Sequence, residues 1–168
     1  QRLWPYYRQA LDNAGIEYQC AVTEYRGHAF EIAKSAVEFD VAVAVGGDGT
    51  INEVLDGVVQ SGNTRLGMGV LYAGTSPDFC QFHNIPVKPQ QAIANLIDGQ
   101  RKQVDVVSVA YRDENGDSVN AHLGCSSNIG LGASVARISN RVRKYVGDMP
   151  GTALALITTI LKNRRYDL

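Results

Sequence analysis

The spacing of apolar and polar residues along the chain alternates between the period of a helix and that of a strand. Apolar side chains in residues 3–14 follow the spacing of an amphipathic helix, and Gly15 comes where such a helix would end. The continuous apolar run at residues 41–45 predicts a strand buried on both faces, as in a parallel sheet. The other segments with one of these patterns are two strands, at 16–23 and 66–72, and three helices, at 26–39, 51–58 and 90–98. This alternation predicts a layered α/β domain with a mostly parallel sheet.

A different pattern begins near residue 104. Two strand-like segments, residues 104–111 and 118–126, flank Asn115-Gly116, a dipeptide that strongly favours tight turns. We therefore expect a β-hairpin. Helical spacing returns beyond it, at 133–145 and 152–163.

Charge divides the chain at about the same place. Residues 1–100 carry 6 basic and 11 acidic side chains, whereas residues 101–168 carry 10 basic and 6 acidic ones. Together with the change of pattern, this predicts one α/β unit over residues 1–103 and a second, incomplete unit over 104–168. The basic residues lack an interleaved aromatic series, which disfavours nucleic acid as a partner.

The composition is that of an ordinary globular protein, with 45% hydrophobic and 20% charged residues. Its three scattered cysteines suit reduced thiols in a cytosol better than a disulfide framework. The longest apolar run, residues 152–161, is shorter than the roughly 20 residues that a membrane-spanning helix needs. We therefore expect a cytoplasmic protein without a membrane span.

The strongest chemical signal follows the apolar run at residues 41–45. Gly46, Gly47 and Gly49 allow positive φ angles and close approach of a ligand to the backbone, and Thr50 is placed to cap a helix starting at Ile51. A strand, a glycine-rich turn and a helix N-terminus together predict a phosphate-binding loop. The chain lacks the Gly-Lys-Ser/Thr of a Walker A loop and the Rossmann Gly-x-Gly-x-x-Gly. An ordinary tight connection between strand and helix is the alternative.

Asp48 lies inside this glycine-rich loop, residues 46–50. A carboxylate about 4 Å from a phosphate charge costs roughly 4 kcal/mol at an effective dielectric near 20. A helix N-terminus returns only about 0.3–1 kcal/mol. Repulsion therefore dominates unless Mg²⁺ lies between the two groups or the carboxylate accepts a proton from an attacking hydroxyl. Both are features of phosphoryl transfer, and a helix-capping Asp without a ligand is the alternative.

Residues 46–57 read Gly-Gly-Asp-Gly-Thr-Ile-Asn-Glu-Val-Leu-Asp-Gly, which resembles the signature of the diacylglycerol kinase catalytic domain family. That family includes bacterial lipid kinases, sphingosine kinases and ceramide kinases. NAD kinases and 6-phosphofructokinases share the five-residue core. The continuation Asn52-Glu53-Val54 and Gly57 favour the lipid-kinase branch. Other segments that resemble the family are Thr23-Glu24 with His28-Ala29, residues 74–79, Asn84-Ile85-Pro86, Val104-Asp105-Val106 and residues 120–132.

The resemblance implies a nucleotide-binding α/β domain followed by a β-rich domain, with transfer of the ATP γ-phosphate to a lipid hydroxyl in the presence of Mg²⁺. It implies that Asp48 orients the acceptor hydroxyl or neutralises charge, and that Asp78 faces the acceptor. Glu53 supports the nucleotide site in this interpretation, although an acid in a first helical turn also has a purely structural use. The residues implied to bind ATP are Thr23, Gly46, Gly47, Asp48, Gly49, Thr50, Glu53, Gly74 and Thr75. No metal ligand is assigned.

The chain departs from the family pattern in three places. Ser76-Pro77 stands where the family usually has Gly-Asn, which removes one backbone N–H and fixes one φ. The family's first strand would precede Trp4, and the later part of its second domain would follow the chain, so we expect a fragment.

The sequence therefore predicts an ATP- and Mg²⁺-dependent lipid kinase, cytoplasmic and in transient contact with a membrane surface. A lipid alcohol such as diacylglycerol is the expected acceptor, and a homodimer is left open. The alternatives are an NAD-kinase-like or other small-molecule kinase with the same loop, and a catalytically degenerate nucleotide-binding domain.

Overall fold

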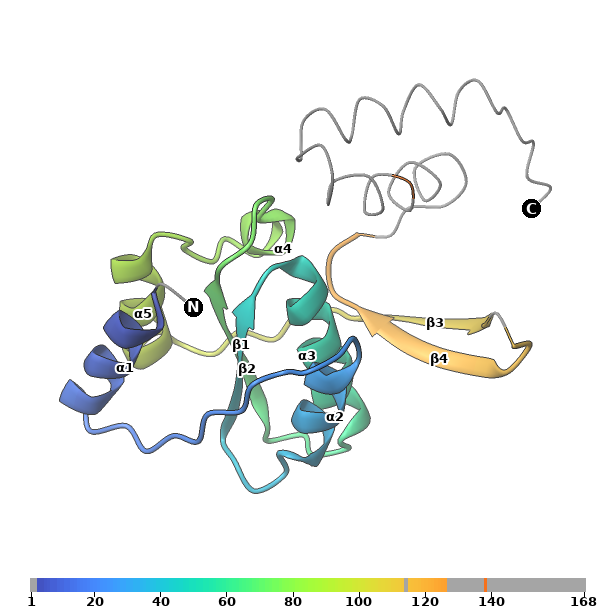
Figure 1. Cartoon of the computed structure of the whole chain (residues 1–168), viewed down its shortest axis with the longest axis horizontal. Helices are drawn as coiled ribbons and strands as arrows, with labels where there is room; N and C mark the ends of the chain where they lie inside the picture. The colour runs from blue at the N-terminus through green and yellow to red at the C-terminus, as the bar shows by residue number, and fades with distance from the viewer. Residues whose placement is uncertain (1–2, 114, 127–137, 139–168) are drawn as a thin grey trace. The chain divides into compact units, whose positions relative to one another are not determined.

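The computed structural model describes residues 3–113, 115–126 and 138. Its described part up to Ser126 forms one compact unit (Figure 1). The elements in chain order are α1 (Trp4–Asn13), α2 (His28–Ser35), β1 (Val41–Gly46), α3 (Asp48–Gln60), β2 (Gly67–Tyr72), α4 (Asp78–Phe82), α5 (Pro89–Asp98), β3 (Val107–Arg112) and β4 (Ser118–Leu123).

Strands β1 and β2 form a parallel pair, in register from Val41 opposite Gly67 to Gly46 opposite Tyr72. Helix α3 connects them, as parallel strands require a crossover. In Figure 1, α2 and α3 lie on one side of this pair, and α1 and α5 lie on the other. The predicted layered α/β arrangement with a parallel sheet is confirmed.

The larger hydrophobic core fills the space between the sheet and the helices α2, α3 and α4. Ile51 and Cys80 are completely buried there. Helices α2 and α3 approach closely at Gly57, where a Cβ would lie 2.5 Å from Phe30 O and 2.8 Å from the Ala33 Cβ. A second core joins α1 and α5 to the opposite face of β2, through Tyr7, Leu11, Leu71, Ala92 and Ile93.

Strand β1 is covered less completely than its apolar sequence predicts. Ala44 is buried, but Val43 and Val45 are 38% and 43% exposed. These valines point to the face where α5 packs, and α5 packs against β2. The prediction of a strand buried on both faces is therefore wrong for β1.

Residues 16–23, predicted to be a strand, belong to no strand. Ile16 is 36% and Val22 is 75% exposed, so apolar burial does not offset the cost of ordering them in a sheet. Helix α2 ends at Ser35, not at residue 39. Val37, beyond this end, is 52% exposed and adds nothing to the core.

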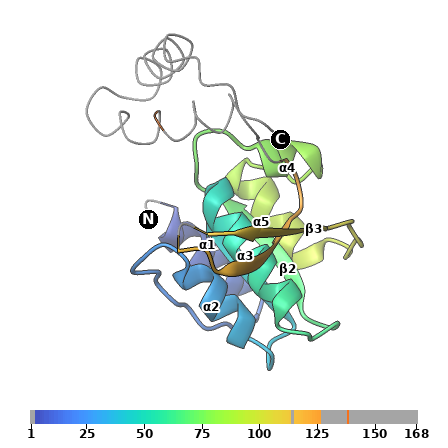
Figure 2. The same cartoon turned by 90° about the vertical axis from the view of Figure 1, so that its right-hand side faces the viewer.

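The β-hairpin is confirmed by the antiparallel pairing of β3 and β4, with Val107 opposite Leu123 and Arg112 opposite Ser118. Gly116 takes the left-handed conformation at the turn, with φ of 87°. Figure 2 shows the hairpin running across α3, and β4 contacts that helix. The helix expected at 152–163 lies outside the described residues, as does all of the one expected at 133–145 except residue 138.

Across residues 3–113 and 115–126, every helix is too short or too polar to cross a membrane.

Candidate functional site

The glycine-rich loop joins β1 directly to α3. Helix α3 begins at Asp48, three residues earlier than predicted, and Gly47 is its extended N-cap. Thr50 therefore lies within the first turn, and no side chain caps this helix, so the predicted Thr50 cap is wrong. Helix geometry leaves the N–H groups of residues 48–50 without an intrahelical acceptor. This end of α3 can therefore receive an anion.

The glycines of the loop serve close approach of the backbone, and none of them has a positive φ, contrary to prediction. A Cβ on Gly46 would lie 2.8 Å from the Thr50 Cβ. A Cβ on Gly47 would lie 3.3 Å from the Gly74 Cα, and one on Gly74 would lie 2.7 Å from the Gly47 Cα. Two glycine backbones thus bring together the loops that follow β1 and β2. Gly49 faces open space, with nothing within 4 Å of a Cβ.

The two candidate acids meet at this junction, although thirty positions separate them. Asp48 Oδ2 accepts a hydrogen bond of 3.2 Å from the Asp78 N–H. Asp48 Oδ1 is buried and has no hydrogen-bond partner among the described residues. A buried, unpaired carboxylate oxygen is costly, so it is an uncommon feature of a folded protein. A cation or a ligand hydroxyl placed there would remove that cost.

The surroundings of Asp48 are apolar and negatively charged. Burial, followed by the charge of Asp48, raises the pKa of the Tyr72 hydroxyl. The same two causes in the same order raise the pKa of the Cys80 thiol. Cys80 therefore remains a neutral thiol at physiological pH and is a poor nucleophile.

The site does not form a preassembled metal cage. The described residues contain no group of three or more His, Cys, Asp or Glu side chains that could hold a metal ion. Mg²⁺ commonly binds through one or two carboxylates together with water and substrate phosphates. Asp48, with its unpaired oxygen, and the neighbouring Asp78 fit that kind of site.

Glu53 connects α3 to the start of α2. Its Oε1 accepts a hydrogen bond of 3.0 Å from the Gly27 N–H. Gly27 is the N-cap of α2 and has a φ of 91°, which favours glycine. Four residues earlier, Thr23 is exposed and makes no side-chain hydrogen bond within the described residues. The structure therefore gives Glu53 a role in holding this segment, but it leaves Thr23 itself without a contact.

His28 is engaged locally. Its Nδ1 accepts a hydrogen bond of 3.1 Å from the Glu24 N–H. Its ring stacks on that of Tyr25 with 4.5 Å between centroids. Both contacts are local, so the described structure gives His28 a role at the start of α2.

The loop after β2 carries Gly74 and Thr75, which are both exposed. Pro77 is the N-cap of α4, which begins at Asp78. Because Pro77 has no N–H, the first backbone donor after Ser76 is the N–H of Asp78, and it is directed to Asp48.

Two features near the site were not predicted from the sequence. Tyr72 lies with its hydroxyl close to Gly74, since a Cβ there would come within 2.5 Å of it. The alternation along β2, with Val70 and Tyr72 in one core, could have placed this ring on the helix side. Asp56 contacts His122 across 66 positions, and no local pattern indicates such a long-range pair.

The chain is similar to proteins of a known family. The family model described as "Diacylglycerol kinase catalytic domain" matches residues 1–109. A diacylglycerol kinase of Staphylococcus saprophyticus is 37% identical over 98 residues, which are 57% of this chain and 32% of that protein. One from Bacillus subtilis is 38% identical over 104 residues, which are 60% of this chain and 34% of that protein.

A crystal structure of a diacylglycerol kinase candidate from Bacillus anthracis has the same fold. The TM-score is 0.58 at 23% identity, over 79% of this chain and 45% of that one. The chain thus matches about a third of the length of its curated relatives and less than half of that solved chain. Because the family model covers more than half of the chain, the chain belongs to the diacylglycerol kinase catalytic domain family.

Proposed function

We propose that this chain is the nucleotide-binding part of a kinase that transfers the γ-phosphate of ATP to a lipid hydroxyl, such as that of diacylglycerol. The observation that carries the proposal is the position of Asp48. Its unpaired Oδ1 is buried at the uncapped N-terminus of α3, within the glycine-rich loop. The names of the related diacylglycerol kinases support the lipid acceptor.

The phosphates bind against the backbone of the glycine-rich loop. Gly46, Gly47 and Gly49 bring no side chain between the ligand and the first-turn N–H groups. The contact between Gly47 and Gly74 places the loop after β2, with Thr75, beside the same ligand. Glu53 contributes indirectly, because it holds Gly27 and the segment that carries Thr23.

Asp48 takes the proton of the acceptor hydroxyl in this proposal. As its Oδ1 accepts the proton, the hydroxyl oxygen forms a bond to the γ-phosphorus. The bond between that phosphorus and the bridging oxygen breaks, and ADP leaves with the electron pair. Asp48 and Asp78 are the residues that would hold Mg²⁺ beside the phosphates, where it would neutralise charge on the transferred group.

The lipid approaches from the side of α4. Asp78 is exposed at the start of this helix. Phe82, at its other end, is 65% exposed and offers an apolar surface to an acyl chain. We propose a transient contact of this side with the membrane surface, in a cytoplasmic protein whose second domain begins at residue 104.

The test is transfer of radiolabelled γ-phosphate by the whole protein to diacylglycerol in mixed detergent micelles. NAD and sugar phosphates are offered in parallel. We expect label in the lipid fraction alone. Transfer to a soluble acceptor with the lipid inert would refute the lipid-kinase assignment. Tight binding of Mg·ATP without transfer to any acceptor would identify a degenerate nucleotide-binding domain.

A further inference from the structure

The helices that begin at the two candidate acids both contact residues 120–124, at the end of the hairpin and just after it. Helix α3 begins at Asp48 and α4 begins at Asp78. Further along, each helix makes polar contacts with the chain at or just after β4. These contacts lie away from the glycine-rich loop and have no part in the mechanism described above.

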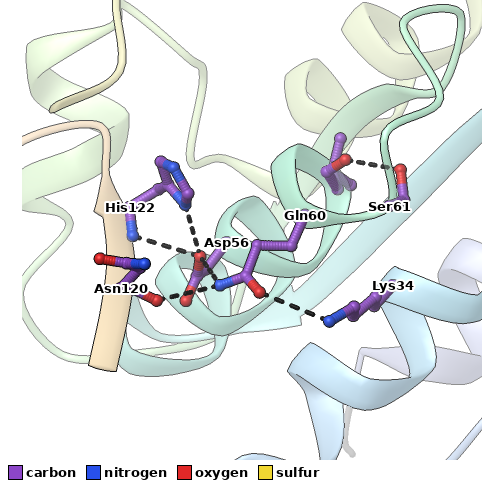
Figure 3. Close-up of polar contacts among 7 residues, drawn as sticks. Lys34, Asp56, Gln60, Ser61, Asn120 and His122 are labelled. Atoms are coloured by element: carbon purple, nitrogen blue, oxygen red, sulfur yellow. Dashed lines mark hydrogen bonds and ion pairs between the residues drawn. The ribbon is translucent and has the colours of Figure 1, made fainter. Parts of the chain in front are cut away.

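On α3, Asp56 and Gln60 bind the edge of β4 (Figure 3). Asp56 Oδ1 accepts hydrogen bonds from the His122 N–H at 3.2 Å and from His122 Nδ1 at 2.8 Å. Gln60 Nε2 donates to Asn120 O at 3.1 Å and to Asp56 Oδ1 at 2.9 Å. Asp56 and Gln60 are four positions apart on α3, so their side chains lie on the same face of the helix. Asn120 and His122 are two positions apart on β4, so their backbone groups lie on the same edge of the strand.

The side chains of Asp56 and Gln60 bind backbone groups of β4 that a neighbouring strand would otherwise bind. An edge strand presents free N–H and C=O groups at alternate residues. Here Asp56 satisfies the N–H of His122, and Gln60 satisfies the C=O of Asn120. The side chains of Asp56 and His122 are only 16% and 19% exposed, so water competes little for the hydrogen bonds between them.

The contact with α4 lies just beyond β4. His83, the C-cap of α4, bonds through Nε2 to Gly124 O at 2.5 Å. Because a carbonyl oxygen only accepts, His83 carries its proton on Nε2. A Cβ on Gly124 would lie 2.6 Å from Leu55 Cδ1 and 3.2 Å from Phe79 Cε2. The Gly124 backbone is therefore held between a side chain of α3 and a side chain of α4.

We propose that residues 120–124 set the position of α3 relative to α4 and thereby the contact between Asp48 and Asp78. Asp56 and His83 are positioning residues in this account, since they act through the helices and lie outside the loop. The proposal rests on the proposed function for its catalytic consequence. Its structural part concerns only the hydrogen bond from the Asp78 N–H to Asp48, which at 3.2 Å is long for a bond to a carboxylate.

The experiment is amide hydrogen exchange by NMR on this chain, comparing wild type with Asp56→Ala. We expect the Asp78 amide to exchange about tenfold faster in the variant. Loss of the Asp56 carboxylate removes its bonds to His122, so the hydrogen bond from the Asp78 N–H to Asp48 should open more often. The His122 amide should exchange faster as well. Val59→Thr, on the exposed side of the same helix, is the matched control and should leave both amides unchanged.

Three further variants, Gln60→Ala, His83→Gln and His83→Ala, keep the test decisive if Asp56→Ala fails to fold. Gln60→Ala removes the bonds to Asn120 and Asp56, together with a long exposed bond from Lys34, and should also accelerate Asp78 exchange. His83→Gln keeps a donor toward Gly124. The Asp78 amide should therefore exchange more slowly in this variant than in His83→Ala. An unchanged Asp78 amide beside an accelerated His122 amide would overturn the proposal, since the strand would then loosen without affecting the acids.

The catalytic consequence has a separate readout. In the whole protein, Asp56→Ala should lower kcat for lipid phosphorylation while the KM for ATP stays within about twofold, because the loop backbone that binds phosphate is unchanged. If no lipid is phosphorylated at all while Asp78 exchange responds to Asp56, the proposed function fails and the positioning role stands. A higher KM for ATP at unchanged kcat would refute the positioning role.

Discussion

Asp48 has one carboxylate oxygen bonded to the Asp78 N–H and one buried without a partner among the described residues. A side chain retained only to cap a helix would direct its oxygens to the first-turn amides, yet α3 has no side-chain cap. The unpaired oxygen is therefore better explained by a ligand than by folding. Burial and the charge of Asp48 raise the pKa values of Tyr72 and Cys80, so these two neighbours stay neutral and bring no further charge to the site.

Asp48→Asn should lower the transfer rate at least about tenfold, since an amide cannot accept the hydroxyl proton and general base catalysis contributes about 10²–10⁴-fold. Asp98→Asn makes the same change of charge at the exposed end of α5 and is the control. The measurement is kcat for the labelled lipid product. Full activity in Asp48→Asn would eliminate the carboxylate from the mechanism while leaving the family assignment intact.

Gly49→Ala separates ligand binding from packing. Nothing lies within 4 Å of a Cβ at this position, and the residue is within α3. Ala in a helix is favoured over Gly by about 0.5–1 kcal/mol, so the variant should unfold at equal or higher temperature. If phosphate lies against this backbone, the affinity for Mg·ATP should fall at least about tenfold, which corresponds to 1.4 kcal/mol. Calorimetry that finds unchanged affinity would place the phosphate elsewhere.

At the scale of elements, the helices and strands with strong local patterns could be predicted from the sequence. These are α1, α5, both parallel strands and the hairpin with its Gly116 turn. Residues 16–23 have the composition of a strand, but a strand also needs a partner and a covered face, which no local pattern reports. For the same reason, the exposure of Val43 and Val45 could not be predicted.

The sequence predicted those parts of the candidate site whose residues are adjacent in the chain, but not the contacts between distant positions. Residues 46–50 carry their own signal, and in the structure they span the junction from the last residue of β1 to the first turn of α3. The junction of Gly47 with Gly74 and the bond between Asp78 and Asp48 depend on the parallel register of β1 and β2. Thr50 was predicted as the cap because the helix was expected to start at the first apolar residue, whereas it starts at Asp48.

The packing of α2 against α3 provides a test of the fold at this scale. A Cβ at Gly57 would lie 2.5 Å from Phe30 O, a backbone atom that cannot move alone. Gly57→Ala should therefore destabilise the protein by about 1–3 kcal/mol, the usual cost of overpacking, despite the better helix propensity of Ala. Urea denaturation measures the change, with Gly49→Ala as the control. Equal stability of the two variants would contradict the close helix contact.

At the scale of the whole molecule, buried acidic groups make stability depend on pH. Burial raises the pKa of the Cys80 thiol above its ordinary value of 9.0 and that of Tyr72 above 10.0. Such groups ionise more readily in the unfolded chain. The stability they contribute is therefore fully present below pH 9.0 and is lost as the pH rises through their folded pKa values.

We expect the free energy of unfolding to decline above pH 9, and to decline less steeply in Cys80→Ala. This variant also leaves a cavity and is less stable at every pH, so the slope against pH is the informative quantity rather than the absolute value. Urea titrations between pH 7 and 10.5 measure it. Identical slopes for the two proteins would show that Cys80 ionises equally in the folded and unfolded chain.

The α/β unit, with helices on both faces of its sheet, brings the glycine-rich loop, the loop after β2 and the two acids together at one place. We propose that a nucleotide binds there. Titration calorimetry of this chain with Mg·ATP, and in parallel with adenosine, tests that claim most directly. We predict one site that binds Mg·ATP at least about tenfold more tightly than adenosine, because the triphosphate supplies the interaction with the loop. Equal affinities, or no binding of Mg·ATP, would contradict a phosphate site at residues 46–50.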